Sequence, residues 1–457
     1  MKKQLKKGLL LFTALLLLTL VLVGCTSAPQ DVPPASAYDI PGEISWSFDS
    51  ASGELVIIGT GAIENYTLWV YDDWGMGTNV DSRPWKWCLS SAKTVTVGEG
   101  ITSIGNHAFD GCTSLKKVNL PNTLERIGAL AFGEASITSL SIPKRVMRIE
   151  SYAFDRCSEL SELSFAKNSA LTYIGEGAFR SCVKLTAVTF PAGLCEIDKE
   201  AFSSCSALSS VKLPAALTKI ASRVFLGCDA LTKIEISANV TEIGDHAFYH
   251  CDKLASVTVS DGVRSIGEKA FSTCPAITEV HLPAGVESIG AEAFNNCKSL
   301  KTVTVAEGSR LTTTGVSTFA GCTALEQVTF GADSALTRIG DSAFACCEKL
   351  KSINIPNGVT LIGDGSFSYC YALEELTLPS QLFRIERSAF AFCTAIESIT
   401  IPRGVKVIVQ GAFQNCDALR EVIFEGSEKE WNAISKRSED WTYLAGRCEI
   451  VFRGSNE

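Results

Sequence analysis

A phenylalanine recurs about every 23 residues through most of the chain, and this period constrains the fold more than any other feature. Eleven of the fourteen are preceded by alanine, and thirteen are followed three residues later by cysteine. A fixed period of this length is typical of a solenoid, in which one short unit stacks on copies of itself. The fourteen are Phe109, Phe132, Phe154, Phe179, Phe202, Phe225, Phe248, Phe271, Phe294, Phe319, Phe344, Phe367, Phe390 and Phe413.

One clear copy of the unit, LASVTVSDGVRSIGEKAFSTC, runs from Leu254 to Cys274. Its first apolar residues alternate with polar ones, which predicts a short strand with apolar side chains facing inward. Stacked coils would pair these strands into a long parallel sheet with one buried and one exposed face. Val263 and Ile266 are expected to cover the turn after the strand. The Ala-Phe-x-x-Cys element is expected to form a short helical turn that places Phe271 and Cys274 in the core.

The repeats occupy residues 93–424 and predict about 14 coils of roughly 23 residues. We expect β-rich caps at 42–92 and 425–457, because an uncapped solenoid exposes a hydrophobic end and an unpaired strand edge. All seven tryptophans lie in these flanks, where large amphipathic rings are suited to sealing the ends. A glycine follows the second isoleucine of many units, but Glu150 and Val409 fill the same position. Close packing, and not left-handed backbone, is therefore expected to favour glycine there.

Thirteen of the 18 cysteines occupy one position of the unit. Parallel side chains in coils about 4.8 Å apart suit the geometry of a disulfide poorly, so we expect reduced thiols packed as small hydrophobic groups. The chain has no Cys-x-x-Cys pair, and we expect no zinc site. The thirteen are Cys112, Cys157, Cys182, Cys205, Cys228, Cys251, Cys274, Cys297, Cys322, Cys347, Cys370, Cys393 and Cys416.

The N-terminus has the pattern of a targeting signal. Four lysines in the first seven residues precede an apolar run from Leu9 to Val23. The run ends in Leu22-Val23-Gly24-Cys25, which resembles a bacterial lipobox, and about 15 apolar residues are few for a membrane-spanning anchor, the alternative interpretation. We predict a signal peptide at 1–24, lipidation of Cys25, and a tether at 25–41 rich in Ser, Ala and Pro. The protein would then be exported and held to the bacterial membrane by lipid.

Charge and motifs exclude several classes of function. The first seven residues hold four of the 41 basic residues, so the remainder carries 37 basic against 50 acidic residues and is unsuited to nucleic acid. The sequence has no motif of a serine hydrolase, a phosphate-binding loop or a dinucleotide-binding turn. His246 and His250 have a spacing that can chelate metal, but no third ligand is near in sequence, and solvated histidines are expected. We expect no enzyme, cofactor or metal.

The exposed positions of the strands are the first candidate for binding. A solvated β surface is the alternative, because threonine is also a good strand residue. The face would be about 60 Å long and large enough for a protein or polymer partner. Its polar candidates are Lys117, Asn119, Glu162, Lys212, Lys233, Glu235, Glu279, His281, Gln327, Asn354 and Glu375, with serines and threonines such as Ser139, Ser141, Ser164 and Thr304 between them.

A second candidate lies in the N-terminal flank. Aromatic residues cluster with carboxylates between Asn65 and Trp87, and such a group can stack on sugar rings or anchor a protein. The alternative is that these rings pack the cap onto the first coil. The candidates are Tyr66, Trp69, Tyr71 and Trp74.

The pattern LxxVxLPxxVxxIGxxAFxxC over residues 93–424 resembles the BspA-like leucine-rich repeats of bacterial surface proteins. The flanks, including Ser45-Trp46-Ser47-Phe48 and Glu430-Trp431-Asn432, resemble the same family. The resemblance implies a leucine-rich-repeat solenoid of the α/β type, with a parallel sheet on one face and short helical turns on the other. It also implies an exported protein associated with adhesion to host proteins or other cells.

The sequence therefore predicts a lipid-anchored surface protein that binds a protein or polysaccharide on host or neighbouring cells through its strand face. Two alternatives remain open: a structural envelope protein that self-associates, and a glycan-binding module centred on the tryptophans of the N-terminal flank.

Overall fold

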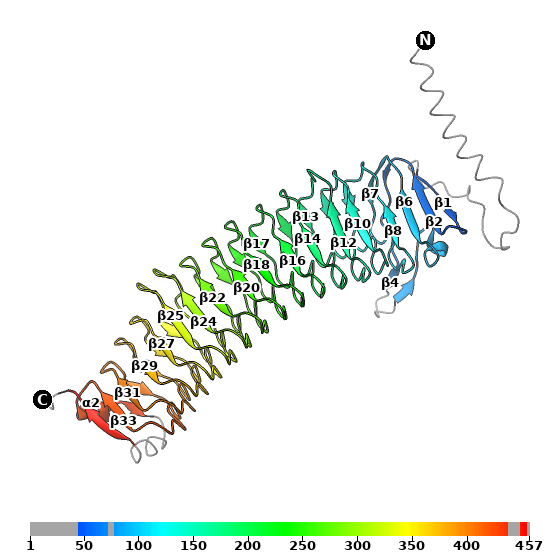
Figure 1. Cartoon of the computed structure of the whole chain (residues 1–457). Coiled ribbons are helices and arrows are strands. Elements are labelled where there is room, and N and C mark those ends of the chain that lie inside the picture. The colour runs from blue at the N-terminus through cyan, green and yellow to red at the C-terminus, as the bar shows by residue number, and fades with distance from the viewer. Residues whose placement is uncertain (1–43, 72–76, 437–447, 455–457) are drawn as a thin grey trace, which may run out of the picture. The chain divides into compact units, whose positions relative to one another are not determined.

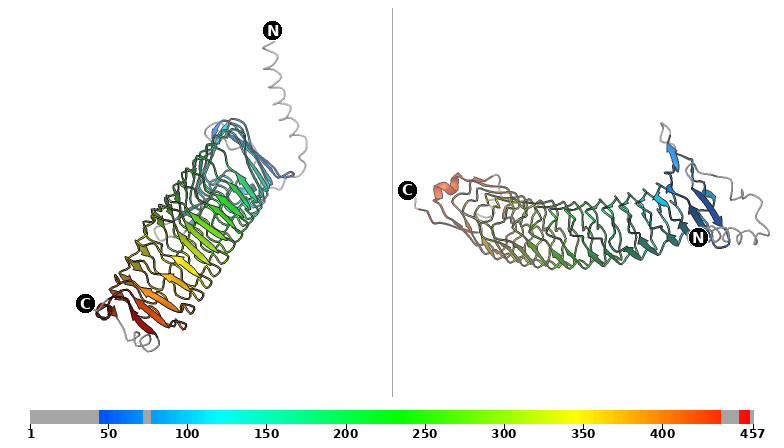
Figure 2. Two further views of the ribbon diagram at one scale, coloured as in Figure 1. Left: turned by 60° about the vertical axis from the view of Figure 1, so that its left-hand side comes forward. Right: turned by 90° about the horizontal axis from the view of Figure 1, so that it is seen from above.

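The computed structural model describes residues 44–71, 77–436 and 448–454. These residues form an elongated solenoid in which each coil adds one step along the axis (Figures 1 and 2). The predicted class of fold is confirmed. The predicted signal peptide, Cys25 and the tether lie outside the described residues.

Each coil contributes one strand to a sheet that we call the front sheet. Alternate residues face inward and outward, as in β22, where Val280 and Leu282 are buried and Glu279 and His281 are exposed. The strands that pair do so in parallel, except β1 and β2, which are antiparallel, and the ladder is interrupted between β8 and β10, β12 and β14, β16 and β18, and β20 and β22. The strands are β1 (Ser45–Asp49), β2 (Glu54–Ile58), β6 (Thr94–Val97), β8 (Lys117–Asn119), β10 (Ser139–Ile142), β12 (Glu162–Phe165), β14 (Ala187–Thr189), β16 (Ser210–Lys212), β18 (Lys233–Glu235), β20 (Ser256–Thr258), β22 (Glu279–Leu282), β24 (Thr302–Val305), β25 (Gln327–Phe330), β27 (Ser352–Asn354), β29 (Glu375–Thr377), β31 (Ser398–Ile401), β33 (Glu421–Phe424) and β35 (Glu449–Phe452).

A second parallel sheet, the side sheet, was not predicted. The residues expected only to cover the turn include a strand, two residues long in most coils, whose isoleucine, such as Ile266, faces the core. So short a strand leaves almost no alternation to detect in the sequence. The strands are β3 (Gly61–Ala62), β7 (Ile101–Ile104), β9 (Arg126–Ile127), β11 (Arg148–Ile149), β13 (Tyr173–Ile174), β15 (Glu196–Ile197), β17 (Lys219–Ile220), β19 (Glu242–Ile243), β21 (Ser265–Ile266), β23 (Ser288–Ile289), β26 (Arg338–Ile339), β28 (Leu361–Ile362), β30 (Arg384–Ile385), β32 (Val407–Ile408) and β34 (Ser435–Lys436).

The third side of each coil is a turn and not the helix that we expected. In every coil the residues two before and two after the ladder phenylalanine have left-handed backbone, as at Lys269 (φ 53°) and Thr273 (φ 56°). Two left-handed residues four apart cannot belong to one right-handed helix. The N–H groups of Lys269, Phe271 and Thr273 instead donate to carbonyls of the next coil at 2.8–2.9 Å. We call the stack of these five-residue segments the turn column.

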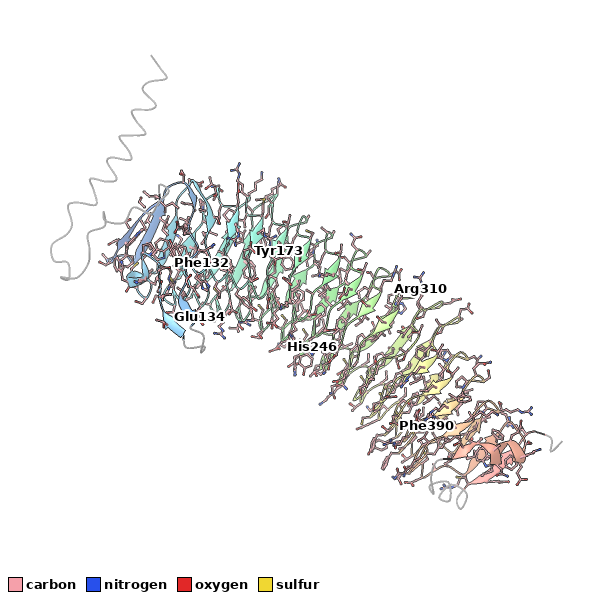
Figure 3. The ribbon with its side chains drawn as sticks, turned by 180° about the vertical axis from the view of Figure 1, so that it is seen from behind. Phe132, Glu134, Tyr173, His246, Arg310 and Phe390 are labelled. Carbon is pink, nitrogen blue, oxygen red and sulfur yellow. The ribbon has the colours of Figure 1, made fainter. Side chains whose placement is uncertain are left out.

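The phenylalanines of the turn column form one continuous stack of rings. Consecutive centroids are 5.1–6.0 Å apart with interplanar angles of 2–20°, and all fourteen rings are buried. Figure 3 shows Phe132 near one end of the stack and Phe390 near the other. Trp85 adds a rung at the N-terminal end, 5.6 Å from Phe109. Offset stacking of this kind adds to the energy of burying each ring.

The ladder cysteines are buried and free, and twelve of them also form a hydrogen bond that we did not predict. The thiol of Cys274 donates to the carbonyl of Phe248 in the preceding coil at 3.1 Å, and the same bond recurs from Cys157 to Cys416 at up to 3.5 Å. Burial raises the pKa of the Cys251 thiol well above its usual value of 9.0, so the thiol keeps the proton that it donates.

The glycine after the second isoleucine is fixed by close packing, as predicted. A Cβ atom at Gly267 would lie 2.5 Å from Asp245 Oδ1 and 2.6 Å from its backbone nitrogen, although φ at Gly267 is not in the left-handed range.

Helix is confined to two short segments among the described residues. They are η1 (Lys86–Cys88) in the N-terminal flank and α2 (Glu428–Ala433) in the C-terminal flank, and a hairpin of β4 (Trp69–Tyr71) and β5 (Gly77–Asn79) leaves the coil stack near the N-terminal end. A capping box between Ser427 and Glu430 begins α2. No helix in the described part of the chain is long and apolar enough to cross a membrane.

Candidate functional site

The exposed side of the front sheet, which we call the strand face, carries its polar side chains in two rows along the axis. Each strand contributes one residue to each row because neighbouring strands pair without a shift. Between β22 and β29, the first row is Glu279, Thr302, Gln327, Ser352 and Glu375, and the second is His281, Thr304, Thr329, Asn354 and Thr377. The backbone therefore sets the spacing of these side chains, and the sequence sets their chemistry.

All eleven candidates predicted for this face lie on front-sheet strands. Ten have exposed side chains, and Asn119 is half-buried. Lys233 and Glu235 form an ion pair of 3.6 Å and are 70% and 76% exposed, so the pair contributes little to stability and leaves both charges available to a partner.

Part of the second row is held in place by hydrogen bonds. His281 Nδ1 lies 2.8 Å from Thr304 Oγ1. Asn354 donates to the carbonyl of Phe330 at 2.7 Å and accepts from its N–H group at 2.8 Å. These side chains present a fixed arrangement of polar groups, which lowers the entropy that a partner must remove on binding.

Two shallow hollows interrupt the N-terminal half of the strand face, where β12 and β14 do not join in one ladder. The first has a volume of about 390 Å³, and the candidate Glu162 lies among the hydroxyls of Ser139, Ser141, Ser161, Ser164 and Thr186. The second, of about 510 Å³, lies against the far end of the same strands and includes Phe165 and Phe190. The structure thus brings Glu162 together with three serines that were named only as neighbours on the predicted face.

The candidates in the N-terminal flank are placed differently. Tyr66 is 7% exposed, and its ring packs at 77° against Trp85 with the centroids 5.4 Å apart. It offers little surface to a partner and packs the cap onto the first coil, as the alternative interpretation held. Trp69 and Tyr71 lie in β4, and their side chains, like the whole of Trp74, fall outside the described residues.

The N-terminal flank supplies a donor for each carbonyl that the first coil would otherwise leave without a partner. The N–H of Tyr66 donates to Asn106 at 2.9 Å, and the indole N–H of Trp85 donates to Ala108 at 2.8 Å. Arg83 Nη1 donates to the carbonyl of Asp110 at 2.6 Å. In later coils, backbone N–H groups of the preceding coil make these bonds. The cap therefore ends the turn column chemically as well as covering its apolar end.

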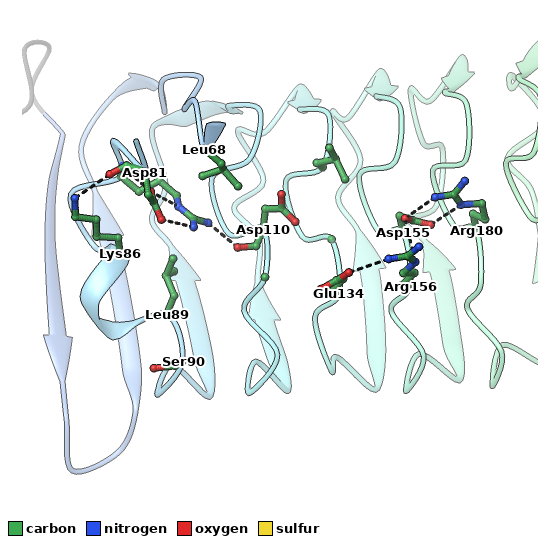
Figure 4. A pocket seen from close by; sticks show the side chains of 14 residues that line it. Leu68, Asp81, Lys86, Leu89, Ser90, Asp110, Glu134, Asp155, Arg156 and Arg180 are labelled. Atoms are coloured by element: carbon green, nitrogen blue, oxygen red, sulfur yellow. Dashed lines mark hydrogen bonds and ion pairs between the residues drawn. The ribbon is translucent and has the colours of Figure 1, made fainter. Parts of the chain in front are cut away.

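A hollow of about 530 Å³ lies between this cap and the turn column (Figure 4). Six of its charged groups form ion pairs: Arg83 with Asp81 at 2.6 Å, Arg156 with Glu134 at 3.1 Å, and Arg180 with Asp155 at 2.9 Å. The other two also have partners, since Lys86 donates to the carbonyl of Asp81 at 2.9 Å and Asp110 lies 2.9 Å from His107 Nδ1. Sequence reasoning missed this group because its members come from four separate coils or caps. Since each charge already has a partner, we assign the hollow a structural role.

The histidines show no metal site. His107 Nδ1 lies 2.9 Å from Asp110 Oδ2, and His250 Nδ1 lies 3.7 Å from Asp252 Oδ1. Burial lowers the pKa of His246, with Arg223 adding to the effect. Within the described residues, no group of three or more metal-binding side chains is present.

Comparison with known proteins identifies the class. Residues 78–209, 195–326 and 312–435 match the family described as BspA type leucine rich repeat region. These matches span more than half of the chain, and the protein belongs to this family. No curated protein sequence matches the chain.

Solved structures of other leucine-rich repeat proteins match the chain. A leucine-rich repeat protein from Bacteroides ovatus is 22% identical, with 91% of this chain and 100% of that chain covered and a TM-score of 0.65. One from Eubacterium ventriosum is 24% identical, covering 74% and 90%, with a TM-score of 0.48. A leucine rich cell surface protein from Faecalibacterium prausnitzii is 24% identical, covering 90% and 100%, with a TM-score of 0.39. At such identities the first of these supports the fold and not a shared partner.

Proposed function

We propose that this leucine-rich repeat protein is anchored by lipid outside the cytoplasm and mediates adhesion by binding a protein of a host or neighbouring cell through its strand face. The observation that carries the proposal is the pair of polar rows on that face. A face about 60 Å long is enough for a protein interface of ordinary size, which takes about 800 Å² from each partner.

The mixture of charges on the face favours a partner with charges of both signs. Lys212 and Lys233 lie in the central coils, whereas Glu279 and Glu375 lie further along the axis, and all four are exposed. Complementary charges would steer the partner and fix its register on the coils. The hydroxyl-lined hollow around Glu162 would add hydrogen bonds at one end of the same face.

The test is direct capture by the full chain, purified in mild detergent, on an array of host matrix proteins and bacterial surface proteins. We expect saturable binding to a protein that Lys233→Glu or Glu279→Lys weakens at least tenfold. Lys219→Glu is the matched control, because Lys219 is also exposed but lies in β17 of the side sheet. Equal losses in Lys233→Glu and Lys219→Glu would argue against the strand face. An array without any hit would favour the alternative of a structural protein that self-associates.

Lipid anchoring is tested separately. Cys25→Ala should move the protein from the membrane fraction to the soluble fraction and abolish incorporation of labelled palmitate, because Cys25 is the predicted attachment point. A variant that stays in the membrane fraction would instead support a spanning anchor.

A further inference from the structure

Three aromatic side chains meet on the outside of the turn column near the C-terminal end. The rings of Tyr369 and Phe392 stack with centroids 4.5 Å apart and an angle of 10°. Tyr371 stands at 78° to Tyr369, 6.2 Å away. Tyr369 is 39% exposed and Tyr371 is 43% exposed. We call these three residues the aromatic platform.

The fold itself disfavours aromatic residues at two of these positions. Tyr369 (φ 61°) and Phe392 (φ 63°) occupy the left-handed position two residues after the ladder phenylalanine. Bulky side chains rarely adopt this conformation, but the same position holds Arg156 and His250 in some coils and Gly227 or Asn415 in others. Since the solenoid forms with such different residues there, the fold does not require the two aromatic rings.

Polar side chains frame the platform on both sides. Along the axis, the coil before Tyr369 carries Cys346 at the same position, and the coil after Phe392 carries Asn415. The hydrogen bonds from Cys346 N to Ser368 O and from Phe392 N to Gln414 O join these coils. In the neighbouring row, Glu348 and Thr394 occupy the position of Tyr371 in the coils before and after it. Thr394 Oγ1 donates to the carbonyl of Tyr371 at 3.4 Å, and Glu348 is exposed.

The exposed area decides what can bind. A tyrosine has roughly 150–250 Å² of surface, so two that are about 40% exposed offer on the order of 150 Å² together. A stable protein interface takes about 800 Å² from each partner. The platform alone is far smaller than that, and its size matches one or two sugar rings, each with an apolar C–H face and a rim of hydroxyls. The carboxylate of Glu348 would accept hydrogen bonds from those hydroxyls, and the amide of Asn415 would accept or donate them.

We propose that Tyr369, Tyr371 and Phe392 form a carbohydrate-binding platform that holds hexose rings of a polysaccharide. The site is on the turn column, so it does not depend on the strand face or on the tryptophans of the N-terminal flank. It would let the protein hold a glycan and a protein partner on different sides of the same coils.

The test is native gel electrophoresis of the full chain in non-ionic detergent, with laminarin, a β-1,3-glucan, or with yeast mannan cast in the gel. We expect at least one polysaccharide to retard the protein. Tyr369→Asn and Tyr371→Thr should weaken the apparent affinity at least tenfold. Both substitutions copy residues that fill the same positions in adjacent or nearby coils, Asn415 and Thr394, so we expect the thermal midpoint to stay equal or rise.

Phe383→Ala is the matched control, because Phe383 is 52% exposed but precedes the side-sheet strand β30. It should leave the retardation unchanged, as should Lys233→Glu, which separates this proposal from the binding role of the strand face. Release by free glucose or mannose would indicate recognition of a single ring, and release only by oligosaccharides would indicate recognition of a chain. If neither polysaccharide retards the protein, the proposal is overturned. So would a wild-type dimer in sedimentation that Tyr371→Thr converts to a monomer, since a second copy would then cover the platform.

Discussion

The turn column and the strand face are built from the same coils, but different forces fix their side chains. In the turn column, ring stacking and hydrogen bonds between coils determine that a coil carries Phe and, in thirteen of fourteen cases, Cys. On the strand face, hydrogen bonds of the backbone hold the sheet, and the outward side chains vary from Lys to Glu to Thr without changing it. The comparison teaches that packing between coils restricts the inward side chains of the turn column, whereas the outward side chains of the strand face can vary without changing the fold, and four measurements can test it.

The largest effect is expected at the phenylalanine stack. Phe271 is fully buried between Phe248 and Phe294, so Phe271→Ala should lower the free energy of unfolding by about 3–5 kcal/mol through lost burial and a cavity. Thr258→Ala on the strand face of the same unit should change it by less than about 0.5 kcal/mol. Urea denaturation followed by circular dichroism would measure both. Similar losses in the two variants would erase the distinction between the two sides.

The second effect concerns the end of the turn column. Arg83 is almost fully buried, pairs with Asp81, and donates to the carbonyl of Asp110. Arg83→Met should cost about 2–3 kcal/mol, because the carbonyls of His107 and Asp110 and the half-buried carboxylate of Asp81 lose the hydrogen bonds that the guanidinium donates. Arg156 lines the same hollow but its side chain is 60% exposed, so Arg156→Met should cost less than about 1 kcal/mol. Equal losses of stability in Arg83→Met and Arg156→Met would mean that the cap does not depend on the hydrogen bonds from Arg83 to the carbonyls of the first coil.

A third test addresses the cysteines. Cys251 is buried and its thiol donates to the carbonyl of Phe225 at 3.3 Å, so Cys251→Ala should cost about 1 kcal/mol. In the native protein, a thiol reagent should modify the exposed Cys195 and Cys346, and it should modify the ladder cysteines only after denaturation. Ladder cysteines that are found oxidised without denaturation would contradict the buried column of free thiols.

The smallest effect is expected at the C-terminal cap. Hydrogen bonds from the backbone N–H of Ser427 and from Arg403 lower the pKa of Glu430 from 4.5 to about 2. A carboxyl whose pKa is lowered on folding stabilises the fold above its unfolded pKa and loses that effect as the pH falls through its folded pKa. The melting temperature of Glu430→Gln should therefore be lower than that of the wild type near neutral pH, and the difference should vanish between about pH 4.5 and about pH 2. If the difference in melting temperature stays constant over this pH range, the ionised carboxylate of Glu430 does not stabilise the cap.

Much of this architecture can be predicted from the sequence, because a repeat shows the same position many times. That repetition predicted the buried phenylalanines and cysteines and the close packing at Gly267. The left-handed turns did not, since residues such as Leu130 and Tyr152 occupy them without the glycine that normally marks such a backbone. The side sheet was missed because its strands are too short to alternate.

For the candidate surfaces, the sequence predicts which single residues are exposed, but it does not predict which of them lie together. The sequence places Glu162 on an exposed strand position, but the hollow around it is lined by residues of three successive coils, and no local motif marks it. The aromatic platform was missed because Tyr369 and Phe392 are 23 residues apart in sequence, and only the stacking of coils brings their rings together.

Three N–H groups of each turn-column segment point toward the C-terminal end, so each coil offers the next one the same three donors. One unit can therefore follow any other, so the number of units can change during evolution while the fold of each coil stays the same. Duplication or loss of a whole unit between two coils would keep every donor opposite an acceptor. It would lengthen or shorten the reach of the protein by about 4.8 Å. A lineage could in this way change the length of the solenoid by unequal recombination alone, without redesigning the contacts between coils.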